Sequence, residues 1–276
     1  MQGEDETMTG EQPPIEAVAR AHAATAAEAY GDLARYLRAL PAEAWGGRSG
    51  CSAWTIRDLA GHVVGEAVWF PILVRGVTRG ERPLPNAIYE ALKTLPAAEL
   101  ADRMEQAARD IPPAVAEATP AQLQQSVDVG WTTLPLWQAT ALPVMEAVYH
   151  HWDARAGREP EATIPPSWAV PLAALLVEVA PLIAQRDGAL AAPGRFLFQI
   201  GDGVGAMTIT VQEGQVRVER GARGTPDVTL QLSADRYARL LAGRLDLARA
   251  LDRGEVQLEG ERDRALALTR VFAGIG

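Results

Sequence analysis

The chain has 276 residues, of which 48% are hydrophobic and 22% charged, a balance typical of a globular protein long enough for two domains. Its formal net charge of -9 argues against nucleic acid or an anionic membrane as the main partner, because both select for basic surfaces. Cys51 is the only cysteine, which excludes an intrachain disulfide and a zinc cage built from thiolates.

Residues 1–12 are acidic and lack an apolar core, so they predict a flexible N-terminus rather than a secretory signal. The longest apolar stretch, from Ala169 to Ala184, is interrupted by two prolines and a glutamate. Such a stretch is not expected to span a bilayer. We therefore expect a cytoplasmic protein without a membrane partner.

Two helices are predicted near the start of the chain. From Pro14 to Leu40, apolar residues recur with the spacing of one helix face. A second helix follows Thr55, which forms a capping-box-like pair with Asp58 and so explains that acid structurally. This helix is expected to run to about Gly76, before the residues that open a loop.

Two further helices complete a predicted bundle. The third spans roughly 97–118, and the segment 119–133 has the Pro, Gln, Asp and Gly content of a loop. The fourth, about 134–156, is apolar on nearly every side, which indicates a central and buried position. Pro143 is expected to kink this helix just before Glu146.

Three side chains on these helices form a candidate metal site. Glu146 and His150 are four residues apart on the fourth helix, so both can converge on one point. His62, about two turns inside the second helix, would complete a set of two histidines and one carboxylate. Such a set leaves a coordination position for water or substrate, as catalytic zinc sites do.

The predicted burial of these groups requires compensation. Unpaired ions inside a protein cost several kcal/mol each, so Glu146, His150 and Asp153 need partners. A cation held with His62 would provide them, and a buried Glu-His-Asp hydrogen-bond network without metal would do so equally. The residues alone leave both interpretations open. Asp153 is expected to accept the second N–H of a histidine ligand and so fix its tautomer.

Other candidates receive structural interpretations. His22 lies on the apolar stripe of the first helix and is expected to be a core histidine bonded to a neighbour. Glu66 is a competing ligand one turn beyond the predicted histidine. His151 points to another side of its helix, and Cys51 reads as a small, half-buried residue beside a helix start rather than a nucleophile.

The second half of the chain changes period. After a proline-rich linker at 159–166, one more helix is expected to run to about Arg186. Four strand-like segments follow, and short glycine-containing turns join the first three as in an antiparallel meander. They span residues 195–200, 206–211, 215–220 and 227–232.

The remaining elements are a helix, a short strand and a closing helix. They are predicted at residues 234–241, 256–260 and 262–272. Together with the meander they predict an α+β domain with an antiparallel sheet that helices cover on one face. The segment 201–203, Gly-Asp-Gly, is explained by a turn and matches no nucleotide-binding fingerprint.

The segments 54–62 (WTIRDLAGH) and 146–153 (EAVYHHWD) resemble the two signature helices of the mycothiol-dependent maleylpyruvate isomerase family. That family belongs to the DinB-like four-helix metalloproteins. The resemblance implies that His62, Glu146 and His150 bind a divalent metal, commonly zinc. Many DinB-like relatives use a third histidine where this chain has the glutamate, which is the version of the maleylpyruvate isomerase branch.

The C-terminal half resembles the sterol-carrier-protein-type domain. The matching features are the strand meander and the segment 254–261 (GEVQLEGE) before an amphipathic helix. The two resemblances together predict a flexible N-terminus at 1–12, a DinB-like metal-binding helical bundle at 13–160 and a sterol-carrier-protein-like α+β domain at 161–276.

The resemblance implies an enzyme that uses a divalent metal, most simply zinc, and a low-molecular-weight thiol, mycothiol or an equivalent. It would act on a small electrophilic acid as an isomerase or an S-transferase. A zinc ion with two neutral imidazoles and one carboxylate keeps a positive charge and would lower the pKa of a bound thiol. The protein then needs no nucleophile of its own, which agrees with a chain that has no catalytic Cys or Ser motif.

Two alternatives use the same chain differently. A metal-dependent hydrolase would generate hydroxide at the same site. A non-enzymatic carrier would hold an apolar ligand in the C-terminal domain, with the bundle as a scaffold. An acidic thiol cofactor would need basic contacts, but the arginines in or near the signature helices are expected to have surface roles. They are Arg57, Arg75, Arg79 and Arg155.

Overall fold

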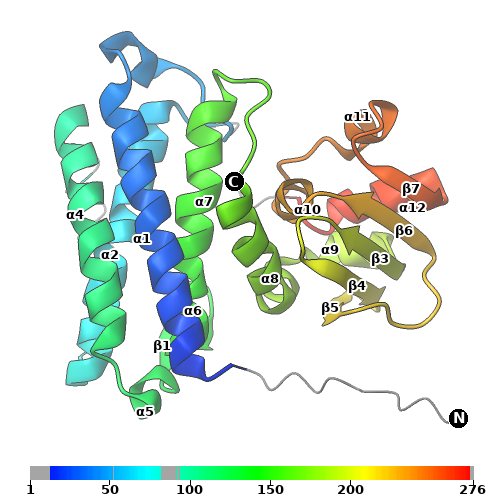
Figure 1. Ribbon diagram of the computed structural model, residues 1–276, viewed down its shortest axis with the longest axis horizontal. Coiled ribbons are helices and arrows are strands. Elements are labelled where there is room, and N and C mark those ends of the chain that lie inside the picture. The colour runs from blue at the N-terminus through cyan, green and yellow to red at the C-terminus, as the bar shows by residue number, and fades with distance from the viewer. Residues whose placement is uncertain (1–12, 52, 82–91, 93, 274–276) are drawn as a thin grey trace, which may run out of the picture.

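A computed structural model describes residues 13–51, 53–81, 92 and 94–273. Long helices stand side by side at one end of the molecule, and a sheet with shorter helices lies at the other (Figure 1). The predicted fold class, a helical bundle followed by an α+β domain, is confirmed. The predicted flexible N-terminus, 1–12, lies outside the described residues.

Four long helices build the bundle: α1 (Ile15–Ala39), α2 (Ile56–Arg79), α4 (Ala97–Ala116) and α7 (Ala141–Ala156). Both α1 and α2 pack against α4 and α7. The buried stripe of α1 is rich in alanine, which lets the neighbouring helices approach closely. Larger side chains, among them Leu33 and Leu59, fill the interior, and each contributes about 1.5–3 kcal/mol by burial.

The predicted capping box is present at the start of α2. The backbone N–H of Asp58 donates to Thr55 Oγ1 (3.1 Å), and Asp58 Oδ2 accepts from the backbone N–H of Thr55 (3.0 Å). The helix runs to Arg79, beyond the predicted end, because Gly80 rather than Gly76 takes the left-handed conformation (φ 74°) that terminates a helix. A 3-10 turn, η1 (Ala42–Gly46), precedes this helix.

The predicted fourth helix is two helices. A short α6 (Leu136–Ala139) ends at Thr140, and α7 begins directly after it. The interruption expected from Pro143 lies at Thr140 rather than just before Glu146, because a proline removes the hydrogen bond to the carbonyl four residues earlier. Pro143 lies in the first turn of α7, where its missing N–H leaves no helical hydrogen bond unmade. Glu146 and His150 therefore lie on one uninterrupted helix.

The segment predicted as a loop contains regular structure. A single turn, α5 (Pro120–Leu123), leads into a hairpin of β1 (Ser126–Asp128) and β2 (Thr133–Pro135). Val127 and Leu134 are partners in the hairpin register, and both are buried. These strands are too short for a period-two pattern to reveal them.

The C-terminal domain begins with α8 (Pro166–Ile183) and α9 (Arg186–Ala191). Its sheet has the order β5-β4-β3-β6-β7, with strands β3 (Gly194–Ile200), β4 (Gly205–Gln212), β5 (Gln215–Arg220), β6 (Val228–Leu232) and β7 (Gln257–Gly260). The antiparallel meander of β3, β4 and β5 is confirmed. β6, however, pairs parallel with β3, so the sheet is mixed rather than purely antiparallel. The reason is that the chain crosses from the edge strand β5 to the far side of β3. Turn residues in the sequence do not indicate such a crossover connection.

The remaining helices are α10 (Ala234–Leu241), α11 (Leu247–Asp252), α12 (Arg262–Ala267) and the 3-10 turn η2 (Leu268–Arg270). Alternate strand residues such as Phe196, Phe198 and Ile209 are buried, as expected for a sheet covered on one face. Phe198 meets the ring of Tyr237 on α10 at 5.2 Å in an edge-on arrangement.

The helix α8 lies between the bundle and the sheet (Figure 1). Contrary to the sequence expectation, its 18 residues have the length and mean hydropathy (1.6) of a membrane span. This helix packs against α10 and β5, and Trp168, Leu172 and Leu176 are buried. Packing inside the protein therefore also accounts for its apolar composition.

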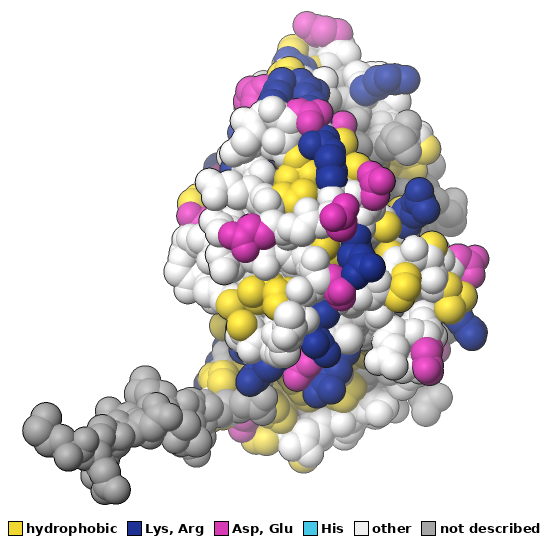
Figure 2. Space-filling model, turned by 90° about the vertical axis from the view of Figure 1, so that its right-hand side faces the viewer, with side chains coloured by type: hydrophobic (Ala, Val, Ile, Leu, Met, Phe, Trp, Pro, Cys, Tyr) yellow, Lys and Arg dark blue, Asp and Glu magenta, His cyan; other side chains and the backbone are white. Residues whose placement is uncertain are grey.

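The outer face of the C-terminal domain carries both signs of charge. Figure 2 shows basic and acidic side chains interleaved over this face. Ion pairs of this domain include Arg262 with Asp252 (2.6 Å) and Arg264 with Asp227 (2.5 Å). Interleaved charges of this kind give no strong field of one sign on this face.

Candidate metal centre

The structure brings His62, Glu146 and His150 together. His62 extends from α2, and the other two lie one turn apart on α7. One carboxylate oxygen of Glu146, Oε2, is 3.1 Å from His62 Nε2 and 3.2 Å from His150 Nε2. The donor atoms all lie within 4.8 Å of one another. The predicted convergence is thus present, and ligation of a metal by these residues stays a prediction.

The cluster is open on one side. The side chain of His150 is only 8% exposed, whereas those of His62 and Glu146 are 28% and 30% exposed. A cation held there could therefore be reached from solvent on the side of His62 and Glu146. Open access of this kind distinguishes catalytic from structural metal sites.

The donor set suits a divalent ion. Two imidazole nitrogens and one carboxylate oxygen are ligands that zinc accepts readily. In the described arrangement both imidazole nitrogens face the same carboxylate oxygen, Glu146 Oε2. A cation shared by all three groups would satisfy this convergence without requiring both rings to donate a proton to that oxygen.

Asp153 makes the contact expected of it. Its Oδ2 accepts a hydrogen bond from Nδ1 of His150 (2.8 Å), and its side chain is fully buried. With the Nδ1 proton held by Asp153, it is the Nε2 proton on the side of Glu146 that a metal would displace, which leaves the tautomer that a metal ligand requires.

Arg244 is the residue near this cluster that sequence reasoning missed. It follows α10 in the C-terminal domain and forms a two-pronged ion pair with Asp153 through Nε–Oδ1 (2.9 Å) and Nη2–Oδ2 (2.7 Å). Its side chain is 7% exposed, and the guanidinium lies 5.0 Å from the ring centre of Tyr149. No motif marks this arginine, because 91 residues separate it from its carboxylate partner.

The local electrostatics keep the carboxylates ionised. Burial alone would raise the pKa of Glu146, but hydrogen bonds with His150 and His62 outweigh it and hold that pKa below its usual range. Burial also acts to raise the pKa of Asp153, but His150 and Arg244 lower it to about 2. For His150, burial lowers the pKa, whereas Asp153, Cys51 and Glu146 raise it well above its usual value. Both carboxylates are therefore ionised and are balanced by Arg244 and the imidazoles, so a cation that binds here would take the place of imidazole protons.

Cys51 lies closer to the cluster than expected. It is buried rather than half-buried, and its thiol donates to Asp153 Oδ2 (3.2 Å) beside His150 Nδ1 (3.8 Å). Cys51, His150 and Asp153 form a second group of metal-type donors. A cation is disfavoured there, because Arg244 already neutralises Asp153 and the shared imidazole nitrogen carries its proton.

We expect Cys51→Ser to leave catalysis nearly intact. The serine hydroxyl can donate to Asp153 as the thiol does, and the sulfur it replaces is buried and already bonded to Asp153. The check is the thiol-dependent turnover of parent and variant at equal metal content. A loss of about a hundredfold at unchanged metal content would place the nucleophile in the protein and contradict this expectation.

We expect Asp153→Asn to lower metal affinity about 10- to 100-fold, the usual effect of disturbing the hydrogen bond behind a histidine ligand. The amide can present its N–H to His150 Nδ1 and so favour the wrong tautomer. Titration with a competing chelator measures the change. An effect below about threefold would mean that Asp153 stabilises the fold without orienting the histidine.

The other histidines and Glu66 do not join the cluster. His22 donates from Nδ1 to Thr140 Oγ1 (2.9 Å), and burial lowers its pKa to about 4, as suits a neutral core imidazole. His151 contacts Asp32 instead (3.0 Å). Among the described residues, Glu66 belongs to neither group of metal-type donors.

The arginines near the signature helices make other contacts. Arg155 pairs with Glu159 (2.7 Å), Arg75 lies 3.8 Å from Glu117, and Arg57 donates to the backbone carbonyl of Leu95. These contacts agree with the surface roles expected from the sequence, and the residues that hold a thiol cofactor stay unassigned.

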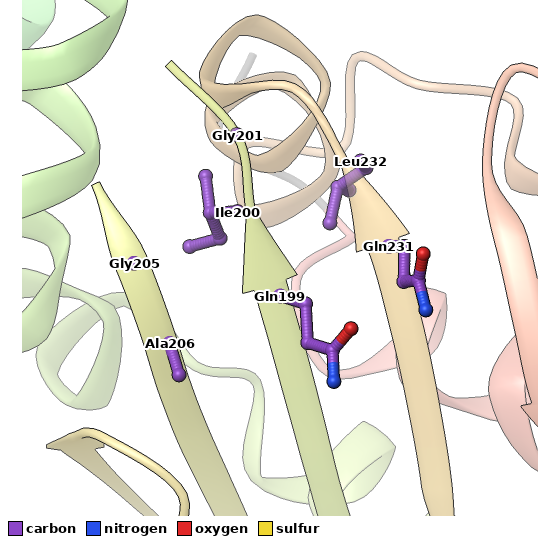
Figure 3. A pocket seen from close by; sticks show the side chains of 7 residues that line it. All are labelled: Gln199, Ile200, Gly201, Gly205, Ala206, Gln231 and Leu232. Carbon is purple, nitrogen blue, oxygen red and sulfur yellow. The ribbon is translucent and has the colours of Figure 1, made fainter. Parts of the chain in front are cut away.

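A separate hollow lies in the C-terminal domain (Figure 3). It measures about 460 Å³ at the ends of β3, β4 and β6. Gln199 and Gln231 are register partners, and their carboxamides point to the same side. The hollow is open, and its lining is mostly apolar beside the two carboxamides.

The fold and the cluster define a class: a helical bundle with a His-Glu-His donor set, joined to an α+β domain. Residues 26–155 match the family model described as the mycothiol maleylpyruvate isomerase N-terminal domain, and residues 184–273 match the SCP-2 sterol transfer family. The bundle is thus similar to the first family and the C-terminal domain to the second.

Solved structures share the two-domain arrangement. The crystal structure of a mycothiol-dependent maleylpyruvate isomerase is 20% identical, with a TM-score of 0.59, and the match covers 90% of this chain and 95% of that one. A histidine-to-alanine mutant of such an isomerase gives 18% identity, a TM-score of 0.58 and the same coverage. At these identities the likeness shows the fold alone.

A further structure is that of the sterol carrier protein domain 2 of Helicoverpa armigera, with 23% identity and a TM-score of 0.31. That match covers 37% of this chain and 83% of the other. A search of curated protein sequences gave no significant match.

Proposed function

We propose that the protein is a divalent-metal-dependent and thiol-dependent isomerase or S-transferase that acts on a small electrophilic acid. The observation that carries the proposal is the open cluster of His62, Glu146 and His150. Two further findings support it: the bundle matches the mycothiol maleylpyruvate isomerase N-terminal domain, and the whole chain shares the fold of a mycothiol-dependent maleylpyruvate isomerase. Zinc is the proposed metal and mycothiol or an equivalent the proposed thiol.

The chain's own residues would hold and orient the reacting groups. His62, Glu146 and His150 would bind the metal, which supplies positive charge that lowers the pKa of a bound thiol. Asp153 fixes the tautomer of His150, and Arg244 keeps Asp153 ionised inside the protein. The exposed edges of His62 and Glu146 leave room for the thiol and the acid to approach.

The reacting sulfur is proposed to come from a diffusible thiol. Cys51 is buried, and its thiol is bonded to Asp153, so it is not placed to attack a substrate. An isomerase would return the added thiol unchanged, whereas an S-transferase would leave its sulfur in the product. Product analysis by mass spectrometry separates these two reactions.

The deciding experiment combines metal analysis with a panel of thiols and small electrophilic acids. We expect about one divalent ion per chain, and turnover that requires both the ion and an added thiol. Turnover by metal-loaded protein without thiol would favour a metal-dependent hydrolase instead. Metal-free protein that co-purifies with lipid and shows no turnover would favour a carrier. His150→Ala serves as the matched control that removes the site.

A further inference from the structure

The two histidines of the candidate centre are held in different ways. The ring of His150 is fixed by hydrogen bonding, because Asp153 accepts from its Nδ1. For His62, the one hydrogen-bond partner of the ring within the described part of the chain is Glu146, on the Nε2 side. No acceptor in that part of the chain holds the other nitrogen of His62, so another interaction must set the plane of its ring.

Trp54 packs against this less restrained ring. The centre of its indole lies 4.8 Å from that of the His62 imidazole, with 48° between the planes. It also lies 6.0 Å from the His150 ring, with 36° between the planes. The two imidazoles are 5.2 Å apart and nearly perpendicular, at 84°. One half-buried tryptophan therefore touches both predicted histidine ligands.

The backbone holds Trp54 firmly at this position. Its carbonyl oxygen accepts from Ser49 N (3.2 Å) and Ser49 Oγ (2.9 Å), and its own N–H donates to the carbonyl of Cys51 (3.2 Å). The next residue, Thr55, caps α2. The loop and the helix start thus fix the backbone from which the indole extends, relative to the helix that carries His62.

We propose that Trp54 is the positioning residue for His62. Packing against the indole fixes the orientation of the His62 ring, as the hydrogen bond to Asp153 fixes the orientation of the His150 ring. The torsion that turns a histidine ring is broad and only weakly restricted by the side chain itself. Aromatic packing restricts it, and a ligand ring that is already oriented loses less freedom when a metal binds. This inference rests on the proposed metal site.

The test compares Zn²⁺ affinity and the visible spectrum of Co²⁺-loaded protein for the parent, Trp54→Leu and Trp54→Phe. We expect Trp54→Leu to bind Zn²⁺ about 2- to 10-fold more weakly and to shift the Co²⁺ absorption bands. We expect Trp54→Phe, which retains an aromatic ring, to restore most of the affinity and the parent spectrum. Trp137→Leu, a half-buried tryptophan on α6, is the control and is expected to match the parent.

The outcomes separate the two proposals. A parent protein that binds neither Zn²⁺ nor Co²⁺ overturns the metal site itself. If the parent binds both ions and Trp54→Leu equals it in affinity and spectrum, the role of Trp54 is overturned while the metal site stands. Should Trp54→Leu fail to fold, nuclear Overhauser contacts between the indole and the His62 ring in the zinc-loaded parent decide, and their absence contradicts the proposal.

Discussion

His150→Ala is expected to abolish metal binding, and His62→Ala is expected to do the same. Each change removes one of three donor groups that lie within 4.8 Å of one another. In His150→Ala it also leaves the buried Asp153 without its imidazole partner. Metal per chain, measured by elemental analysis after gel filtration, should fall from about one ion to near zero in both variants.

The control for these variants is His22→Ala. His22 also lies in the bundle but bonds Thr140 rather than the cluster, so its loss should leave metal content unchanged. Equal metal content in His62→Ala, His150→Ala and the parent would refute the assigned ligands. Glu146→Gln should fold and bind metal more weakly, because it keeps the volume of the side chain and removes its charge. Parent-like affinity in that variant would exclude Glu146 as a ligand.

Arg244→Met is expected to have the second largest effect, although Arg244 belongs to the other domain. The change leaves a fully buried carboxylate, Asp153, without its two-pronged partner. Breaking a buried pair from one side costs about 3–5 kcal/mol of unfolding free energy. Because the carboxylate also orients His150, metal affinity should fall about 10- to 100-fold. Denaturant unfolding of metal-free protein and chelator competition measure the two effects separately.

A matched arginine tests whether the effect is specific. Arg239 also lies between the domains, paired with Asp235 (2.7 Å) and placed 5.3 Å from the ring centre of Trp152. Arg239→Met should destabilise the interface and leave metal affinity near that of the parent. If both variants lower metal affinity equally, the domain contact as a whole matters rather than the Arg244–Asp153 pair. A double variant, Arg244→Met with Asp153→Asn, then measures their coupling.

Local sequence rules predicted the elements that carry the site. Thr55 and Asp58 are three residues apart, so a capping box could be predicted before any tertiary contact was known. Glu146 and His150 are four residues apart, and helix geometry alone places them on one face. For Pro143 the expected position was wrong: a proline removes the hydrogen bond to the carbonyl four residues earlier, here that of Ala139, so the interruption lies at Thr140 rather than just before Glu146.

Contacts between distant segments could not be predicted in the same way. The parallel pairing of β6 with β3 depends on where the chain returns after β5, whereas turn residues report only the connection between neighbours. Cys51 and Asp153 are far apart along the chain, so local spacing could not predict the hydrogen bond of 3.2 Å from the thiol to the carboxylate.

Spacing along the chain was enough to predict the long helices, the meander, the division into two folds and the three residue types of the candidate centre. Each of these follows from spacing within one segment, where a period of 3.6 or 2 residues dictates which side chains share a face. Only the tertiary structure decided what surrounds that centre: Arg244 on Asp153, Cys51 beside it, and Trp54 against both imidazoles. These contacts join separate segments of the chain, and they form because buried charges and rings must find partners once the domains pack together.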